Sequence, residues 1–221
     1  MSTKPEYQIR SITEVDTEPV LDHLREFFFR TEPMNESVKL LENKDSRCIS
    51  LEKYCLKCMS SGVSYLAVTE SNKIVSVILN AVCDVDQQSH EQIKDSDAKY
   101  EKIINFVNFL GEKGTEAILK KFPGCKKVLD IKILSTDTKW RGKGIAGALV
   151  ECSRKVGFDK GCELIRIDCS SYYSAKVAEK LGFDLIYTFP FADYKEDGKS
   201  VFLLPHPHVS ATVYVQKLTT P

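Results

Sequence analysis

One stretch between a predicted strand and a predicted helix carries residues suited to binding an anion. It reads Leu134-Ser-Thr-Asp-Thr-Lys-Trp-Arg-Gly-Lys-Gly-Ile-Ala146. Gly142 and Gly144 allow a tight turn and a close approach of the backbone to a ligand. Consecutive backbone N–H groups at a helix N-terminus, with Arg141 and Lys143 beside them, attract negative charge. We predict that this loop cradles a pyrophosphate.

The loop matches neither of the two common nucleotide-binding patterns, Gly-x-x-x-x-Gly-Lys-Ser/Thr and Gly-x-Gly-x-x-Gly. It fits Arg/Gln-x-x-Gly-x-Gly/Ala through Arg141, Gly144 and Ala146. That pattern resembles the acetyl-CoA loop of the GCN5-related N-acetyltransferases. A helix end at Leu181-Gly182-Phe183 that leads into a strand agrees with the same resemblance. The alternative reading is a basic helix start with an incidental pair of glycines.

The order of predicted elements indicates a mixed α/β sheet in a single domain over residues 1–221. The 221 residues carry no repeat, low-complexity tract or linker. The resemblance implies a mostly antiparallel sheet of about seven strands, flanked by helices and splayed at the acetyl-CoA site. We expect strands at 7–10, 63–69, 73–82, 127–135, 163–169, 183–189 and 211–217, helices at 16–28, 36–43, 50–60, 100–110, 115–122, 144–157 and 173–181, and a polar loop at 84–97.

Other segments narrow the resemblance to insect arylalkylamine N-acetyltransferases of the dopamine N-acetyltransferase type. Phe27-Phe-Phe-Arg-Thr-Glu-Pro-Met-Asn35 is similar to their Glu-Pro-Leu/Met-Asn segment. Ile167-Asp-Cys-Ser-Ser-Tyr-Tyr-Ser-Ala175 is similar to their serine-containing segment. Pro207-His208, followed by Val213-Tyr-Val215, is similar to their last strand. The similarity spans nearly the whole chain, with little that is diagnostic between 83 and 126.

The resemblance implies that Glu32 is the general base. An alkylamine with a pKa near the ~10.4 of lysine is protonated at neutral pH and must lose a proton before it attacks a thioester. Three adjacent Phe residues would raise the pKa of Glu32 by desolvation. Without the surrounding match, Glu32 would read as a surface acid at a helix end.

The resemblance also assigns the remaining site residues. Ser170 and Ser174 map to paired catalytic serines, or else Ser170 caps the next helix and Ser174 lies in its first turn. Tyr173 either protonates the CoA thiolate or packs as an aromatic. Pro33, Met34 and His208 fall on the amine side, with His206 as a second candidate histidine. The acetyl-CoA contacts are expected at Leu134, Ser135, Arg141, Gly142, Lys143, Gly144, Ile145, Ala146 and Ser174.

Composition excludes several other classes of protein. Lys+Arg and Asp+Glu number 31 each, so the net charge of zero predicts no nucleic-acid partner. No apolar run reaches the ~18 residues of a membrane span, and the N-terminus has no secretion signal, so we expect a cytoplasmic protein without a membrane partner. The eight cysteines are expected as reduced thiols. Cys55-x-x-Cys58 lacks a second ligand pair, and we predict no metal.

The function expected from these features is transfer of acetyl from acetyl-CoA to a small primary amine. Dopamine, serotonin, octopamine and tryptamine are the substrates that the resemblance implies. Two alternatives stay open: an agmatine or polyamine N-acetyltransferase of the same fold, and a module that binds acyl-CoA without transferring it. We expect a monomer.

Overall fold

The computed structural model describes residues 6–85 and 97–219. Part of the predicted polar loop, 86–96, lies outside the described residues. The elements run in the order β1 (Gln8–Ser11), η1 (Glu14–Asp16), α1 (Thr17–Leu24), η2 (Arg25–Phe29), α2 (Pro33–Ser37), α3 (Ile49–Ser60), β2 (Tyr65–Val68), β3 (Ile74–Asp84), α4 (Ala98–Lys121), β4 (Lys127–Thr136), η3 (Thr138–Trp140), α5 (Ile145–Asp159), β5 (Leu164–Cys169), α6 (Tyr172–Lys180), β6 (Asp184–Pro190), η4 (Phe191–Asp193), β7 (Lys195–Glu196), β8 (Lys199–Ser200) and β9 (Ser210–Lys217).

Seven strands form one mixed sheet in the order β1-β2-β3-β4-β5-β9-β6. All neighbours are antiparallel except β4 and β5, which run parallel. The parallel pairing stops at Ile131 opposite Ile167, although β4 continues to Thr136 and β5 to Cys169. The two strands therefore part at their carboxyl ends, and the predicted splayed, mostly antiparallel sheet is confirmed.

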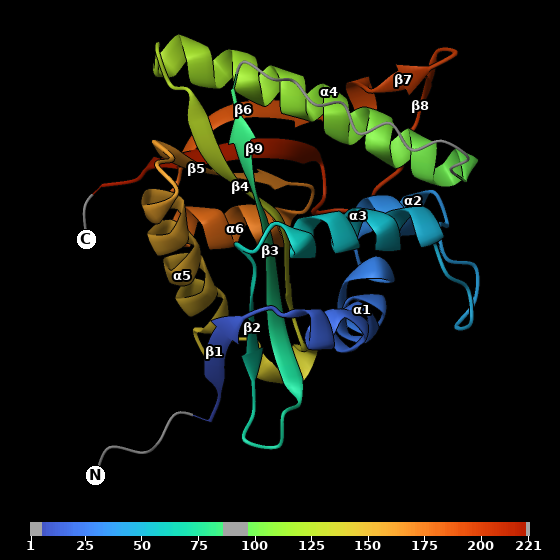
Figure 1. Cartoon of the computed structure of the whole chain (residues 1–221). Coiled ribbons are helices and arrows are strands. Elements are labelled where there is room, and N and C mark those ends of the chain that lie inside the picture. The colour runs from blue at the N-terminus through green and yellow to red at the C-terminus, as the bar shows by residue number, and fades with distance from the viewer. Residues whose placement is uncertain (1–5, 86–96, 220–221) are drawn as a thin grey trace.

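Helices cover both faces of the sheet (Figure 1). The apolar stripes of α1, α3 and α4 pack on one face, in a core that includes Leu66, Leu79 and Ile133. Helix α5 and helix α6 pack on the other face, with Leu129, Ile131 and other side chains. No helix in the described ranges is long and apolar enough to cross a membrane.

A one-residue bulge interrupts β4. Leu79 of β3 pairs with Ile133 and Asn80 with Ile131, which leaves Lys132 as an extra residue. A bulge shifts the alternation of side chains between the two faces. Ile131 accordingly faces the α5 side, whereas Ile133 joins the core beneath α1, α3 and α4. The side chains of Lys132 and Ile133 therefore lie on the same face of the sheet.

Most predicted elements are confirmed, and three expectations are wrong. The helices expected at 100–110 and 115–122 are one helix, α4, because its glycines do not break it. Pro33 occupies the first turn of α2, where its missing N–H costs nothing. The short helix expected at 36–43 is instead Pro33–Ser37. The small hairpin of β7 and β8 was not predicted.

Candidate active site

Glu32 lies at the start of α2 and caps that helix. Its Oε2 accepts a hydrogen bond from the backbone N–H of Asn35 at 2.8 Å, and Pro33 fills the first helical position. The Asn35 side chain donates to the carbonyl of Phe29 at 3.0 Å and so ties α2 to the preceding segment. Glu-Pro-x-Asn therefore encodes a rigid turn that fixes the Glu32 carboxylate.

The Glu32 carboxylate is buried and only half satisfied. Glu32 is 6% exposed, and its Oε1 has no hydrogen-bond partner among the described residues. Burial raises the pKa of Glu32, while interactions with the Ser170 side chain and the Asn35 backbone act in the opposite direction. A carboxylate with a raised pKa and a free oxygen is suited to accept a proton near neutral pH.

A cavity of about 120 Å³ opens onto Glu32, and we call it the Glu32 cavity. Met34 and Ser170 also line it, as predicted for an amine site, whereas Pro33 and His208 are not among its walls. Most of the walls are apolar side chains: Phe28, Leu51, Tyr54, Tyr100, Ile103, Ile104, Phe106, Val107, Leu110, Ile131 and Ile133. The shape and lining suit a small, largely apolar molecule with one polar end.

Four alternating charges, which we call the charge tetrad, stand where β4 and β5 part. Lys132 donates to Asp130 at 2.6 Å, and Arg166 binds both oxygens of Asp168 at 2.7 Å. Asp130 and Arg166 are paired across the two strands. Asp130, Lys132 and Asp168 line the Glu32 cavity. Sequence analysis missed this feature, although the spacing of two opposite charges in each apolar strand was its signal.

The pKa values of the two acids in the charge tetrad shift in opposite directions. Burial alone would raise the pKa of Asp130, but Lys132 and Arg166 hold it below its ordinary value. Burial raises the pKa of Asp168 in spite of Arg166, and the neighbouring Asp130 adds to that rise. Two acids and two bases cancel, so the tetrad brings no net charge to the cavity.

The exposed peptide edge of β4 faces the gap between β4 and β5. The Ser135 carbonyl accepts from the Ser76 hydroxyl of β3 at 2.8 Å, and Asp137 donates its N–H to the carbonyl of Val75. Peptide groups alternate in direction along a strand, so those of Leu134 point into the gap. Leu134 and Ser135 are both among the predicted acetyl-CoA contacts, and Leu134 is the one whose N–H points into the gap.

The predicted phosphate loop joins β4 to α5 in the expected conformation. Gly142 and Gly144 both have φ of 78°, in the left-handed region that favours glycine, and Gly144 is the N-cap of α5. Ile145 anchors the helix start in the core beneath α5, and Ala146 follows it. The fifteen-residue α5 thus presents its N-terminal N–H groups at the loop.

The two basic side chains of the loop differ in their surroundings. Arg141 reaches only the Thr136 carbonyl, through a 3.4 Å contact, and is exposed. Lys143 bonds Glu6 at 2.6 Å and lies over the Trp140 ring at 4.4 Å. Arg141 is therefore the cation more available to an anion at this loop.

The start of α6 corrects one detail of the sequence reading. Ser171, not Ser170, is the N-cap, and it forms a capping box with Ser174. Ser174 Oγ lies 2.9 Å from Ser171 Oγ and does not line the Glu32 cavity. Ser170 lies one residue before the cap, and it lines the Glu32 cavity.

Tyr173 and His208 meet on the outside of α6. Tyr173 is 64% exposed, so its ring is not the packed aromatic considered above. Its ring centroid lies 5.5 Å from that of His208. His208 Nδ1 accepts the backbone N–H of Tyr172 at 3.2 Å, which fastens the segment before β9 to the start of α6. Phe189 and Phe191 pack around Phe106.

His23 of α1 is a further residue that sequence analysis did not find. Its Nε2 lies 3.2 Å from Ser135 Oγ, and its Nδ1 has no partner among the described residues. Burial lowers the pKa of His23 to about 4, so the ring is neutral at pH 7. The contact connects the helix that leads to Glu32 with the edge of β4.

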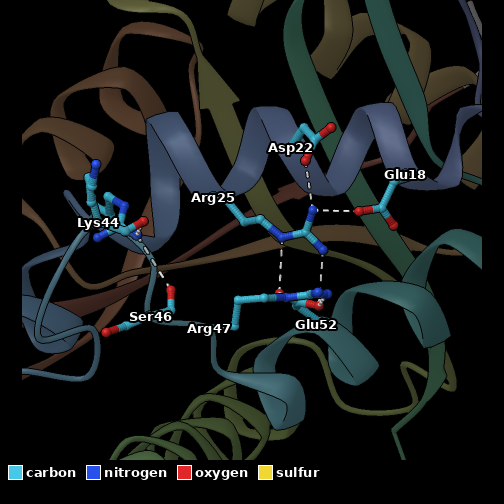
Figure 2. A network of polar contacts seen from close by, with 8 residues as sticks. Glu18, Asp22, Arg25, Lys44, Ser46, Arg47 and Glu52 are labelled. Carbon is cyan, nitrogen blue, oxygen red and sulfur yellow. Dashed lines mark hydrogen bonds and ion pairs between the residues drawn. The ribbon is translucent and has the colours of Figure 1, made fainter.

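An ion-pair network also fastens this part of the chain, as Figure 2 shows. Glu52 of α3 accepts from Arg25 at 3.0 and 3.1 Å and also binds Arg47. Arg25 bonds Glu18 and Asp22 as well. The segment η2, a π-helical turn of the kind often found at functional sites, is thereby held against α3 just before Glu32.

The two cysteines of the Cys-x-x-Cys segment pack in the hydrophobic core. Cys55 and Cys58 are both buried in α3. Within residues 6–85 and 97–219, no group of three or more His, Cys, Asp or Glu side chains is placed to hold a metal ion.

Comparison with known proteins supports the fold. No family model matches the chain. Arylalkylamine N-acetyltransferase 2 from Aedes aegypti is similar, with a TM-score of 0.84 and 26% identity over 96% of this chain and 99% of that one. A Drosophila melanogaster polyamine N-acetyltransferase that forms N-acetylagmatine has a TM-score of 0.83 and 23% identity over 96% and 100%. The chain therefore has the N-acetyltransferase fold, and its structural neighbours include the insect arylalkylamine enzymes that the sequence resembles.

Proposed function

We propose that this protein is an N-acetyltransferase that transfers acetyl from acetyl-CoA to a small primary amine. One observation carries the proposal: the buried Glu32 carboxylate has an unpartnered oxygen and opens onto an apolar cavity beside the parting of β4 and β5. Similarity to a solved arylalkylamine N-acetyltransferase supports the same reaction. All of these groups belong to one sheet and its helices, and we propose that residues 1–221 act as a single domain and as a monomer.

Glu32 is the base in the proposed reaction. An ammonium substrate gives its proton to Glu32, whose raised pKa brings its proton affinity closer to that of the amine. The neutral nitrogen then attacks the thioester carbonyl and forms the C–N bond. The nitrogen gives its second proton to solvent, and the C–S bond breaks as the oxyanion collapses and the thiolate leaves. Ser170, whose side chain interacts with Glu32, holds the carboxylate toward the amine.

The gap between β4 and β5 is the proposed seat of the thioester. The N–H of Leu134 stabilises the oxyanion of the tetrahedral intermediate. We assign protonation of the departing thiolate to the exposed Tyr173, and Ser174 shapes the helix start beside it. The loop 141–146 binds the pyrophosphate through backbone N–H groups at the N-terminus of α5, with Arg141 as the free cation. His208 and Pro33 act by fixing the segments that carry Tyr172 and Glu32.

The cavity walls favour an arylalkylamine, such as dopamine, serotonin, octopamine or tryptamine, over a polyamine. Phe28, Tyr54, Tyr100 and Phe106 offer ring faces to an aromatic tail. The charge tetrad has no net charge with which to attract a second cation. Agmatine is the alternative that the similar Drosophila protein suggests.

Release of CoA thiol with acetyl-CoA and tryptamine tests the proposal. We expect Glu32→Gln to lower kcat/KM by about 10²–10⁴, the usual contribution of a general base. Glu26→Gln, at an exposed acid in the preceding segment η2, is the matched control and should behave as wild type. Binding of acetyl-CoA without thiol release on any amine would instead identify a non-catalytic acyl-CoA module. Equal kcat/KM for Glu32→Gln and wild type would remove Glu32 as the base.

A further inference from the structure

Lys132 brings an ammonium group of the protein itself to the wall of the Glu32 cavity. Its Nζ lies 2.6 Å from Asp130 Oδ2. The side chains of Lys132 and Asp130 are 26% and 10% exposed, and both line the Glu32 cavity and a neighbouring cavity of about 530 Å³. This ion pair is therefore within reach of a molecule that fills the Glu32 cavity.

The bulge in β4 brings Ile133 to the same side of the sheet as Lys132. Because Lys132 is the unpaired extra residue, it shares the cavity side of the sheet with Ile133 as well as with Asp130. A regular strand would have placed Ile133 on the opposite face. A local irregularity beside the proposed reaction site thus sets an apolar side chain next to the ammonium group on the cavity wall.

The two carboxylates of the charge tetrad are held by unequal partners. Arg166 is 4% exposed, binds both oxygens of Asp168 and also donates to carbonyls of α4, so it is fixed. Lys132 makes its ion pair through a single ammonium on a flexible stem. Asp130 is consequently the carboxylate whose partner a ligand could replace.

We propose that Lys132 is a specificity-determining residue that excludes amines with two positive charges. Its ammonium occupies the position on Asp130 that the distal cation of a diamine would take. The second positive charge of a dication is repelled by the Lys132 ammonium. It also finds no unpaired carboxylate in the charge tetrad. A monocation with an apolar tail has no second charge and is not disfavoured in either way. This inference rests on the proposed function, because it concerns the amine of that reaction.

Replacement of Lys132 by Met tests the inference. Methionine has a similar unbranched shape, and the charge tetrad becomes net negative. Thiol release is measured for tryptamine and for 1,3-diaminopropane, putrescine, cadaverine and agmatine, a series that samples different charge separations. We expect the ratio of kcat/KM for the best dication to that for tryptamine to rise about tenfold or more. Lys132→Arg, which keeps the charge, should leave the ratio unchanged.

Two further variants separate this effect from a general loosening of the cavity. Lys127→Met removes a lysine that lines only the larger cavity and should not change the ratio. Adding Asp130→Asn to Lys132→Met should abolish the gain, because no unpaired carboxylate remains. If Lys132→Met does not fold, Lys132→Gln removes the charge while it keeps a polar end and serves in its place.

Calorimetric titration of putrescine into each variant distinguishes failure of this inference from failure of the proposed function. Absence of acetyl transfer by the wild type to any amine would refute the proposed reaction. Binding of putrescine about tenfold tighter to Lys132→Met than to wild type would still support the exclusion of dications. A wild type that prefers putrescine to tryptamine, or an unchanged ratio and unchanged putrescine affinity in folded Lys132→Met, would overturn it.

Discussion

Gly114 of α4 lies directly against the guanidinium of Arg166. A Cβ at position 114 would be 2.3 Å from Nη2 and 2.8 Å from Cζ of Arg166. The guanidinium cannot retreat easily, because it holds both oxygens of Asp168 and the carbonyl of Gly111. A glycine that costs a helix about 1 kcal/mol elsewhere is therefore required here for the charge tetrad to pack beneath α4.

This contact predicts opposite effects for two glycines of the same helix. Gly114→Ala should destabilise the protein by about 1–3 kcal/mol, the usual cost of overpacking. Gly111→Ala, which meets nothing within 4 Å, should be neutral or stabilising by up to about 1 kcal/mol. Urea unfolding followed by circular dichroism measures both variants. Equal stability of the two would mean that Arg166 adjusts freely.

The alternation of side chains in β4 shows why part of the site could not be predicted. The strand was predicted over 127–135, but the charges of Asp130 and Lys132 within it were left without an explanation. The bulge explains them, since Leu129 and Ile131 face α5 whereas Ile133 faces the opposite core. A bulge leaves only a break in periodicity, and a break alone does not tell which charges become neighbours across strands.

Short sequence motifs, by contrast, predicted part of the local structure that they form. The glycine-rich loop predicted the helix start at Gly144, the N-cap of α5. The helix start at Glu32 was not predicted, because the helix was expected at 36–43. His23 and Ser135 are in contact although they are 112 positions apart in the sequence. No local sequence pattern predicts such a contact. The cap of α6 was assigned one residue early, because adjacent serines are equally good caps in sequence.

Glu32 is expected to lower the stability of the protein at neutral pH. Its pKa in the folded protein is raised, so folding favours the protonated form and the folded state loses stability as the pH rises through that pKa. Glu32→Gln removes the buried charge, and its amide oxygen can still accept from Asn35. We expect the melting temperature of the variant to exceed that of wild type at pH 8, with a gap that narrows toward pH 4. Glu26→Gln, at an exposed acid, is the control. A gap independent of pH would contradict the burial argument.

The loop before α5 should determine acetyl-CoA affinity. Arg141→Glu reverses the available charge, and Gly144→Val forces a β-branched residue into a φ of 78°. We expect either change to weaken acetyl-CoA binding at least about tenfold, measured by titration calorimetry. Lys155→Glu makes the same charge change on an exposed face of α5, away from its N-terminus, and should have little effect. Unchanged affinity in a folded Arg141→Glu variant would place the pyrophosphate elsewhere.

Substitutions of the two adjacent serines at the start of α6 should have different effects, one on catalysis and the other on stability. Ser171 accepts the N–H of Ser174 at 3.0 Å as the cap of the helix, so Ser171→Ala should cost about 1 kcal/mol of unfolding free energy. Ser170 makes no cap, and its side chain lowers the pKa of Glu32. Ser170→Ala should therefore leave stability nearly unchanged but raise the pKa of Glu32.

The pH dependence of kcat/KM on tryptamine distinguishes the two serines. Activity requires ionised Glu32, so a higher pKa means that the acidic limb of the profile moves to higher pH in Ser170→Ala. Ser171→Ala should keep the limb of the wild type, since it alters the helix start and not the carboxylate. Urea unfolding of both variants under the same conditions supplies the stability comparison. A limb that moves in Ser171→Ala and stays fixed in Ser170→Ala would reverse the roles of the two hydroxyls.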